Sequence, residues 1–165
     1  VLAIALAGNP EILFADEPTT ALDVTIQAQI LDVFRRIQKK LEMATVFISH
    51  DLGVVAGVAD RVAVMYGGKL VETGDVYEIF KNPCHEYTKG LLASIPKAHE
   101  KGNRLRAIPG TPPDLMDPPK GCPFAARCNE TMVVCQQFMP EYSDCGSNHK
   151  SACWLLDPRA KGGKA

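Results

Sequence analysis

The chain has 165 residues, which is enough for one ordinary domain and a small additional segment. Hydrophobic residues make up 46% of it and charged residues 22%, so the chain can bury a core and does not have the composition of a disordered protein. The 18 basic and 19 acidic residues leave a formal net charge of -1, which argues against nucleic acid as a partner. No run of apolar residues approaches the length of about 18 that a membrane span needs.

The chain opens with Val1 and the sequence VLAIALAG, in which strong helix formers end at Gly8. We interpret this opening as a fragment that begins inside a helix. No basic leader precedes the apolar residues, as a secretory signal would require. The six cysteines are therefore expected in a reducing compartment, where metal or redox roles are more common than disulfides. Disulfides in an exported domain are the alternative.

Three segments after Pro10 describe a strand, a helix and a second strand. The run ILFAD at 12–16 is apolar and of strand length, and the proline of the following Glu-Pro pair ends it. Apolar residues then recur every three or four positions up to residue 41, as in a helix that Asp23 is placed to cap. TVFIS at 45–49 is the second strand. This order predicts a βαβ unit in a parallel sheet, with both strands buried in its centre.

A hairpin and a short helix are predicted next. Residues 61–66 and 69–73 flank a Gly67-Gly68 pair, which is a two-residue turn signal, so we expect a hairpin at the edge of the same sheet. Asp75 and Glu78 have the spacing of a capping box and predict a helix through residue 80.

The composition changes beyond this helix. Six of the 12 prolines lie between positions 109 and 123, which predicts a stiff linker. Residues 121–153 contain five of the six cysteines and little hydrophobic periodicity. Because such a segment cannot build much of a core alone, we expect it to need a cross-link. We interpret the tail, residues 161–165, as frayed.

Polar side chains follow both predicted strands of the βαβ unit. Asp16 and Glu17 end the first strand, and His50 follows the second. Ligands of parallel sheets bind outside the carboxyl ends of the strands, so the three side chains can meet on one ligand. An aspartate there suits Mg²⁺ on a nucleotide, and the next carboxylate suits a group that orients or deprotonates a water for attack on the terminal phosphate. His50 could donate a hydrogen bond to that phosphate. The alternative is a solvated strand end with His50 in a loop.

The longer string ILFADEPTTALDVTIQAQIL, followed at the expected distance by TVFISHD, resembles the second half of the ATP-binding subunit of ABC transporters. The resemblance implies that residues 12–16 are the Walker B strand, with Asp16 as the magnesium aspartate and Glu17 as the catalytic glutamate. It implies that residues 20–23, ending in Asp23, form the D-loop, which communicates across an ATPase dimer, and that His50 is the switch histidine. The sequence DEPTTALDVTIQAQIL is typical of the ABC ATPases of oligopeptide and dipeptide importers.

Two parts of the family's site do not occur in this sequence. The glycine-rich loop G-x-x-x-x-G-K-S/T, which holds the phosphates, is missing, and so is the family's signature sequence. We therefore expect a C-terminal fragment that carries the hydrolysis half of the site and is inactive alone.

Four cysteines of the C-terminal segment have the spacing C-x5-C-x6-C-x17-C: Cys122, Cys128, Cys135 and Cys153. Zinc sites usually have closer pairs, and four thiolates on a segment without its own core also suit an iron–sulfur cluster. Zinc, reduced thiols and disulfides are the alternatives. Cys145 and His149 are spare candidates that we interpret as bystanders, and Cys84 as a lone thiol outside the group.

The resemblance extends almost to the end of the chain. The strings NPCHEYTKGLLASIP, RLRAIPGTPPDL and GCPFAARC look like the C-terminal extension of peptide-importer ATPases, with HEYT at 85–88 in place of the usual His-Pro-Tyr-Thr. In this family, GCPFAARC with a following cysteine and an Ala-Cys near the end looks like the ligand set of a 4Fe-4S cluster. The resemblance therefore implies such a cluster on Cys122, Cys128, Cys135 and Cys153.

The expected fold class is α/β, the C-terminal half of an ABC ATPase parallel-sheet domain of the P-loop NTPase type with a small Cys-rich extension. We expect a partial ATPase domain at 1–80, a helix and proline-rich linker at 81–120, a Cys-rich metal-binding segment at 121–156 and a flexible tail at 157–165.

The resemblance implies hydrolysis of ATP with Mg²⁺, coupled to import of oligopeptides or dipeptides, at the cytoplasmic face of the cell membrane. It implies three partners: a second ABC ATPase subunit in a homo- or heterodimer, transmembrane permease subunits and, indirectly, an extracellular or periplasmic peptide-binding protein. One alternative is a cluster-bearing interaction module without ATPase activity. Another is an ABC ATPase for a different substrate, such as nickel or antimicrobial peptides.

Overall fold

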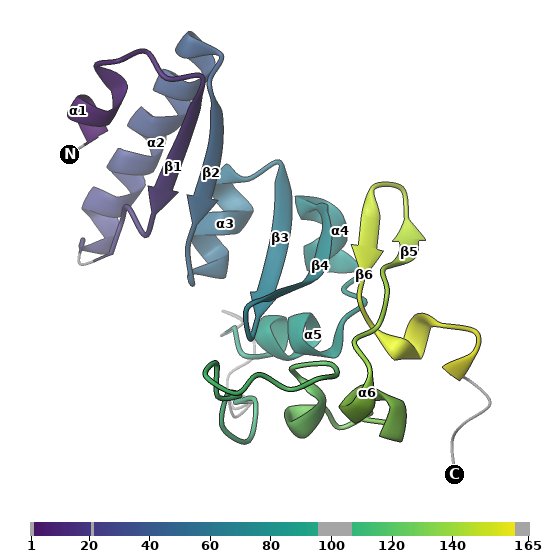
Figure 1. Cartoon of the computed structure of the whole chain (residues 1–165). Helices are drawn as coiled ribbons and strands as arrows, with labels where there is room; N and C mark the ends of the chain where they lie inside the picture. Colours follow the sequence, from purple (N-terminus) through teal and green to yellow (C-terminus); the bar gives the residue numbers. More distant parts are fainter. Residues whose placement is uncertain (1, 21, 96–106, 161–165) are drawn as a thin grey trace, which may run out of the picture. The chain divides into compact units, whose positions relative to one another are not determined.

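The computed structural model describes residues 2–20, 22–95 and 107–160 and has a mixed α/β fold, as the sequence predicts (Figure 1). The tail at 161–165, for which we expect fraying, lies outside the described residues. The chain divides into two compact units, one up to Ala59 and one from Asp60 onward, whereas the sequence suggests a boundary after residue 80. Among the described helices, none is long and apolar enough to cross a membrane.

The first unit is the predicted βαβ arrangement. Its elements are α1 (Leu2–Leu6), β1 (Ile12–Asp16), α2 (Val24–Leu41), β2 (Ala44–Ile48) and α3 (Leu52–Val58). Strands β1 and β2 pair in parallel, from Ile12 opposite Ala44 to Asp16 opposite Ile48. Asp23 caps α2 as predicted, because its Oδ1 accepts a hydrogen bond from the Ile26 N–H at 2.9 Å. Helix α3 was not predicted.

Only one face of the β1–β2 sheet is covered by the described residues. Leu13 and Ala15 are buried on that face, together with Phe34 of α2 and Met43. The opposite face exposes four large apolar side chains: Ile12, Phe14, Val46 and Ile48. The prediction that both strands are buried in the centre of a sheet is therefore wrong for the described structure. The strands have apolar residues on both faces, as central strands do, but the described part of the chain packs against one.

The second unit contains a four-stranded antiparallel sheet with the order β3-β4-β6-β5 (Figure 1). The strands are β3 (Arg61–Tyr66), β4 (Lys69–Asp75), β5 (Ser143–Gly146) and β6 (His149–Ser151). Gly67 and Gly68 have φ angles of 55° and 74°, which fits the two-residue turn that joins β3 and β4. The predicted hairpin is confirmed. In the second unit, β4 also pairs with β6 from the far end of the chain, a partner that the sequence did not predict.

Short helices complete the second unit: α4 (Val76–Lys81), α5 (Glu86–Ala93), α6 (Val133–Gln137) and the 3-10 turns η1 (Ala125–Arg127) and η2 (Trp154–Leu156). Helix α4 begins after Asp75, but the predicted capping box is wrong. Asp75 makes no side-chain cap bond and lies 3.8 Å from Arg61 instead, and Glu78 accepts a hydrogen bond from the Asn82 side chain.

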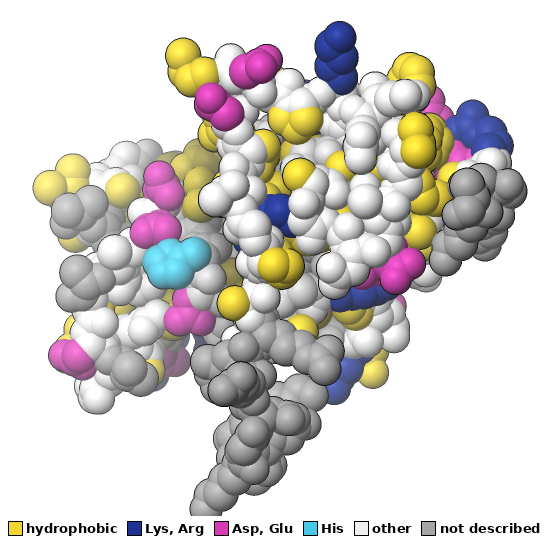
Figure 2. Space-filling model, turned by 90° about the horizontal axis from the view of Figure 1, so that it is seen from below, with side chains coloured by type: hydrophobic (Ala, Val, Ile, Leu, Met, Phe, Trp, Pro, Cys, Tyr) yellow, Lys and Arg dark blue, Asp and Glu magenta, His cyan; other side chains and the backbone are white. Residues whose placement is uncertain are grey.

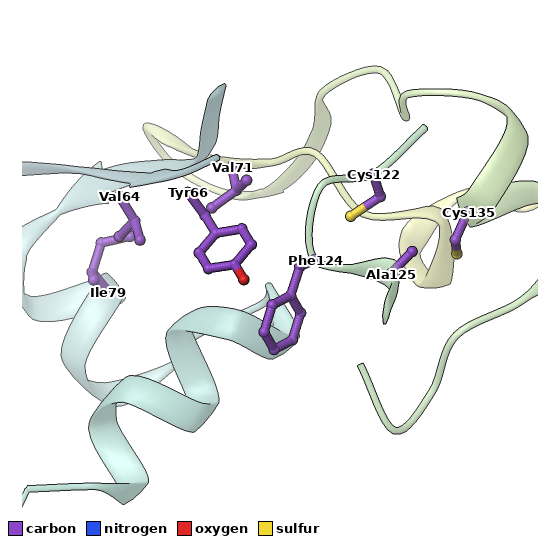
Figure 3. Close-up of a cluster of buried hydrophobic side chains, with 8 residues drawn as sticks. All are labelled: Val64, Tyr66, Val71, Ile79, Cys122, Phe124, Ala125 and Cys135. Atoms are coloured by element: carbon purple, nitrogen blue, oxygen red, sulfur yellow. The ribbon is translucent and has the colours of Figure 1, made fainter. Parts of the chain in front are cut away.

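The Cys-rich segment shares the core of the second unit. Phe124 packs edge-to-face on Tyr66 of β3, with ring centroids 5.3 Å apart. Figure 3 shows Cys122 and Cys135 at one end of this cluster and Val64 and Ile79 toward the other. Arg127 extends the contact, because its guanidinium donates to the Tyr66 hydroxyl at 3.0 Å. The segment thus has apolar partners on β3, β4 and α5 that its own sequence did not reveal.

Candidate functional site

The structure brings Glu17 and His50 together at the carboxyl ends of β1 and β2. Nδ1 of His50 lies 2.8 Å from Oε1 of Glu17. Asp16 directly precedes Glu17, is the last residue of β1 and is exposed. In the space-filling view, a histidine side chain lies among acidic side chains at the surface (Figure 2). The arrangement presents carboxylates and an imidazole at one sheet edge, where they can meet a ligand from solvent.

The local backbone fixes the direction of the Glu17 side chain. Glu17 has a φ of 43°, which a residue other than glycine seldom adopts, and its N–H donates to the Ile48 carbonyl at 2.9 Å. The Thr20 hydroxyl donates to Oε2 of Glu17 at 2.8 Å. Sequence reasoning placed Thr20 in the D-loop and did not find this contact. A hydroxyl three residues after an acid in a turn is the only sequence signal for it.

Electrostatics favour the charged forms of both partners. The hydrogen bond from His50, followed by that from Thr20, lowers the pKa of Glu17 below its usual value of 4.5. The hydrogen bond to Glu17 and the charge of that carboxylate raise the pKa of His50 above its usual value of 6.5. Both groups are open to solvent, with 42% and 77% of their side chains exposed, so the pair can exchange its contacts for those of a ligand.

The segment that we assigned to the D-loop leads into α2. Ala21 of this segment lies outside the described residues. Asp23, its last residue, is exposed and has a structural role as the cap of α2. Thr19 just before the segment is buried, and its hydroxyl accepts a hydrogen bond from the Gln27 side chain at 3.3 Å. The turn between β1 and α2 is thus tied to α2 by a side-chain hydrogen bond.

The four cysteines singled out from the sequence line one small cavity of the second unit. Other walls of this cavity are His85, Glu86, Phe124 and Trp154. Cys122 and Cys135 are buried, and the Cys122 N–H donates to the Cys135 carbonyl at 2.7 Å. Burial raises the pKa of Cys128 and of Cys153 to about 11. Cysteines that line one cavity from separate parts of the segment are candidate ligands for a metal group.

Cys145 and His149, which we interpreted as bystanders, lie close to Cys84 in the same unit. Sγ of Cys84, Sγ of Cys145 and a ring nitrogen of His149 are all within 4.8 Å of one another. Cys84 is therefore not a lone thiol. His149 is fully buried and lies 2.7 Å from Glu72, a buried carboxylate of β4. No motif in the sequence marks this group, because its members come from the α4–α5 connection, β5 and β6.

Comparison with known proteins gives a consistent result. Residues 71–135 match the family model described as the oligopeptide/dipeptide transporter, C-terminal region. The chain is 57% identical over 161 residues to the dipeptide transport ATP-binding protein DppD of Bacillus subtilis, an alignment that covers 98% of this chain and 48% of that protein. It is 56% identical to the oligopeptide transport ATP-binding protein OppD of the same organism, covering 97% of this chain and 45% of that protein.

A more distant relative is the oligopeptide transport ATP-binding protein OppD of Mycoplasma genitalium, which is 45% identical over 97% of this chain and 40% of that protein. The chain spans about half the length of the curated relatives it matches. The resemblance to the C-terminal region of peptide-transport ATP-binding proteins, predicted from the sequence motifs, is confirmed.

Proposed function

We propose that this chain is the C-terminal part of an ATP-binding subunit that hydrolyses ATP to drive import of dipeptides or oligopeptides by an ABC transporter. The contact between Glu17 and His50 at the carboxyl ends of two parallel strands is the observation that carries the proposal. The similarity to transport proteins named for dipeptides and oligopeptides supports the substrate class.

Asp16 and Glu17 have separate roles in this proposal. The exposed carboxylate of Asp16 is the kind of ligand that Mg²⁺ takes when it also binds nucleotide phosphates, and the bound ion would neutralise charge on those phosphates. Glu17 would orient the attacking water and accept its proton while the bond between the terminal phosphorus and ADP breaks. The lowered pKa of Glu17 keeps the carboxylate ionised for this role.

His50 would hold Glu17 and contact the terminal phosphate at the same time. Its Nδ1 faces Glu17, so Nε2 is the nitrogen available to a phosphate oxygen. The raised pKa of His50 favours the imidazolium form, in which both ring nitrogens donate hydrogen bonds. The pair thereby places a donor beside the carboxylate that positions the water.

Kinetics of the full-length subunit test these roles. Glu17→Gln should retain ATP binding and lower hydrolysis by about 10²-fold or more, the range expected for loss of a positioned general base. His50→Ala should behave similarly. The matched control is Asp32→Asn on α2, an exposed carboxylate that pairs with Arg36 one turn along the helix, which should leave the rate unchanged. A Glu17→Gln rate within about twofold of the unmodified protein would contradict the assignment.

The remaining parts of a complete site would come from outside this chain. We place the phosphate-binding loop in another part of the full-length subunit, which would also cover the exposed apolar face of β1 and β2. A second ATPase subunit would meet the D-loop at 20–23, and transmembrane permease subunits would hold the assembly at the cytoplasmic face of the membrane. The peptide-binding protein would act indirectly, and the near-neutral charge gives no role to nucleic acid. The isolated chain should therefore show no ATP turnover above background.

The cavity lined by the four cysteines is proposed to bind a 4Fe-4S cluster. Its donor set fits this group, because four cysteines line one cavity and two of them are buried. Within the described residues, the group compact enough for a single ion consists of other side chains, so the four cysteines suit a larger metal group better than one zinc ion.

Metal analysis of anaerobically purified protein tests the cluster. We expect a brown protein with about four irons per chain. Cys128→Ser should remove the iron and the colour, whereas Cys84→Ser, at a half-exposed position outside the cavity, should keep both. A colourless protein whose single zinc disappears in Cys128→Ser would replace the cluster with a zinc site. Pairwise oxidised cysteines in metal-free protein would contradict both.

A further inference from the structure

A second group of metal-binding side chains lies in the unit that starts at Asp60, outside the four-cysteine cavity. Cys84 precedes α5, Cys145 lies in β5 and His149 begins β6. Their two Sγ atoms and a ring nitrogen of His149 are all within 4.8 Å of one another. Of the described residues, these three alone form a group of at least three acidic, cysteine or histidine side chains compact enough for a single ion.

The buried imidazole of His149 has one nitrogen without a partner. His149 has no solvent exposure, and its Nε2 lies 2.7 Å from Oε1 of Glu72. Nδ1 is buried and has no hydrogen-bond partner in the described structure, which is uncommon for a polar atom in a protein interior. A histidine that binds a metal usually has a carboxylate on its other ring nitrogen, and Glu72 occupies that position here. Nδ1 is thus the ring nitrogen of His149 that is left without a hydrogen bond and is free to bind a metal ion.

Glu72 also fixes the segment that carries Cys84. Its Oε1 accepts a hydrogen bond from the Cys84 N–H at 2.6 Å, and its Oε2 accepts one from the His85 N–H at 3.1 Å. The same fully buried carboxylate therefore holds the backbone of one candidate ligand and the ring of another. This preorganisation is what a small metal site needs from the residues around its ligands.

The two thiols lack strong partners of their own. The Cys84 thiol donates to the Asn82 carbonyl at 3.5 Å and the Cys145 thiol to the Ser143 carbonyl at 3.7 Å. A bound cation would stabilise both thiolates.

We propose that Cys84, Cys145 and His149 bind one Zn²⁺ ion, with Glu72 as the positioning residue. Two thiolates and one imidazole are ligands that zinc prefers, and three protein ligands leave one position for water. Binding releases one proton from each thiol to solvent, and the two thiolates balance the charge of the ion. The site would join the start of α5 to the β5–β6 hairpin, and it does not depend on the ATPase function.

Zinc and iron analysis of the full chain, purified anaerobically, separates this site from the cysteine cavity. We expect one zinc per chain that Cys84→Ser and Cys145→Ser both remove without loss of iron, and Cys128→Ser as the matched control should keep the zinc. Cobalt in place of zinc should give a thiolate-to-cobalt charge-transfer band that Cys84→Ser abolishes. Glu72→Gln should weaken zinc binding by about 10- to 100-fold, the effect usual for a residue behind a ligand.

Three results would overturn the proposal. The first is zinc bound with unchanged affinity by the double variant Cys84→Ser, Cys145→Ser. The second is a wild-type chain that binds no zinc or cobalt when titrated with either ion. The third is a disulfide between Cys84 and Cys145 in anaerobically purified protein, found by mass spectrometry without reduction. Because Cys84 and Cys145 are half-buried, their serine variants keep the test valid even where Glu72→Gln fails to fold.

Discussion

The two compact units each contain a glutamate–histidine pair, and the two pairs differ in burial rather than in geometry. Glu17 and His50 lie 2.8 Å apart with 42% and 77% of their side chains exposed, whereas Glu72 and His149 lie 2.7 Å apart and are fully buried. An exposed pair costs little to separate, so it can turn to a ligand and back. A buried pair is costly to break and therefore holds structure in place.

The sheets of the two units also differ in burial. The β1–β2 sheet is covered on one face and exposes Phe14 and Ile48 on the other. The sheet of the second unit buries Val71 and Ile79 completely, and distant residues such as Phe124 complete its core. The first unit thus leaves an apolar sheet face available for other parts of an assembly, while the sheet of the second unit contributes Val64 and Val71 to the core of its own unit.

Two phenylalanines of the first unit give the largest expected contrast. Phe34 is 5% exposed and packs at 5.8 Å on Phe47, whereas Phe14 is 69% exposed. Phe34→Ala should lower the free energy of unfolding of this chain by about 3–5 kcal/mol, as for other buried aromatic residues. Phe14→Ala should change it by less than about 0.5 kcal/mol, as for surface positions. Urea unfolding of both variants measures the difference.

The same pair of variants tests whether the open face is covered in the longer protein. In the full-length subunit, Phe14→Ala should become costly, by about 3 kcal/mol, if further residues bury the face. A Phe14→Ala cost in the isolated chain equal to that of Phe34→Ala would show that the face is already covered in solution, for example by self-association.

Local sequence signals were enough for β1, α2 and β2 of the first unit, but not for α3, and they were enough for the β3–β4 hairpin. Asp23 marks the start of α2, and Gly67 with Gly68 marks a turn that few other residues could make. Local sequence signals did not predict pairings between residues that are far apart in the sequence. Glu72 pairs in register with Ser151, and neither the three-residue strand β6 nor its place beside β4 has a local signature.

The buried pair of the second unit should contribute measurably to stability. Glu72 hydrogen-bonds with His149 and with the N–H groups of Cys84 and His85, so Glu72→Gln disrupts a hydrogen-bond network in the interior. We expect a loss of about 2 kcal/mol in the free energy of unfolding in metal-free protein. Glu17→Gln is the matched substitution in the exposed pair and should have a much smaller effect. Equal effects in urea unfolding would mean that burial does not distinguish the pairs.

Some site residues could be predicted from the sequence, and others could not. Asp16 ends β1, and Glu17 and His50 lie just beyond the ends of β1 and β2, so the parallel order alone brings them to one edge. Thr20 contacts Glu17 through a turn whose geometry depends on the positive φ of Glu17, which its sequence does not suggest. Glu72 looks like an outward-facing residue of an alternating strand. It is buried because α4 and β6 pack around β4. No residue near Glu72 in the sequence indicates this packing.

The smallest expected effect is a change in titration of the exposed pair. The bond to Glu17 and then its charge raise the pKa of His50 above 6.5, and the bond from His50 lowers the pKa of Glu17 below 4.5. The ion pair therefore exists between these two values. It is lost as pH falls through the lowered pKa of Glu17, and as pH rises through the raised pKa of His50.

Proton NMR of the His50 ring, assigned with His50→Gln, should show a titration midpoint above 6.5 that Glu17→Gln returns toward 6.5. Asp32→Asn should not move that midpoint. A His50 midpoint that is unchanged in Glu17→Gln would show that the pair does not form in solution, and the proposed link between the water-orienting carboxylate and the phosphate donor would fail with it.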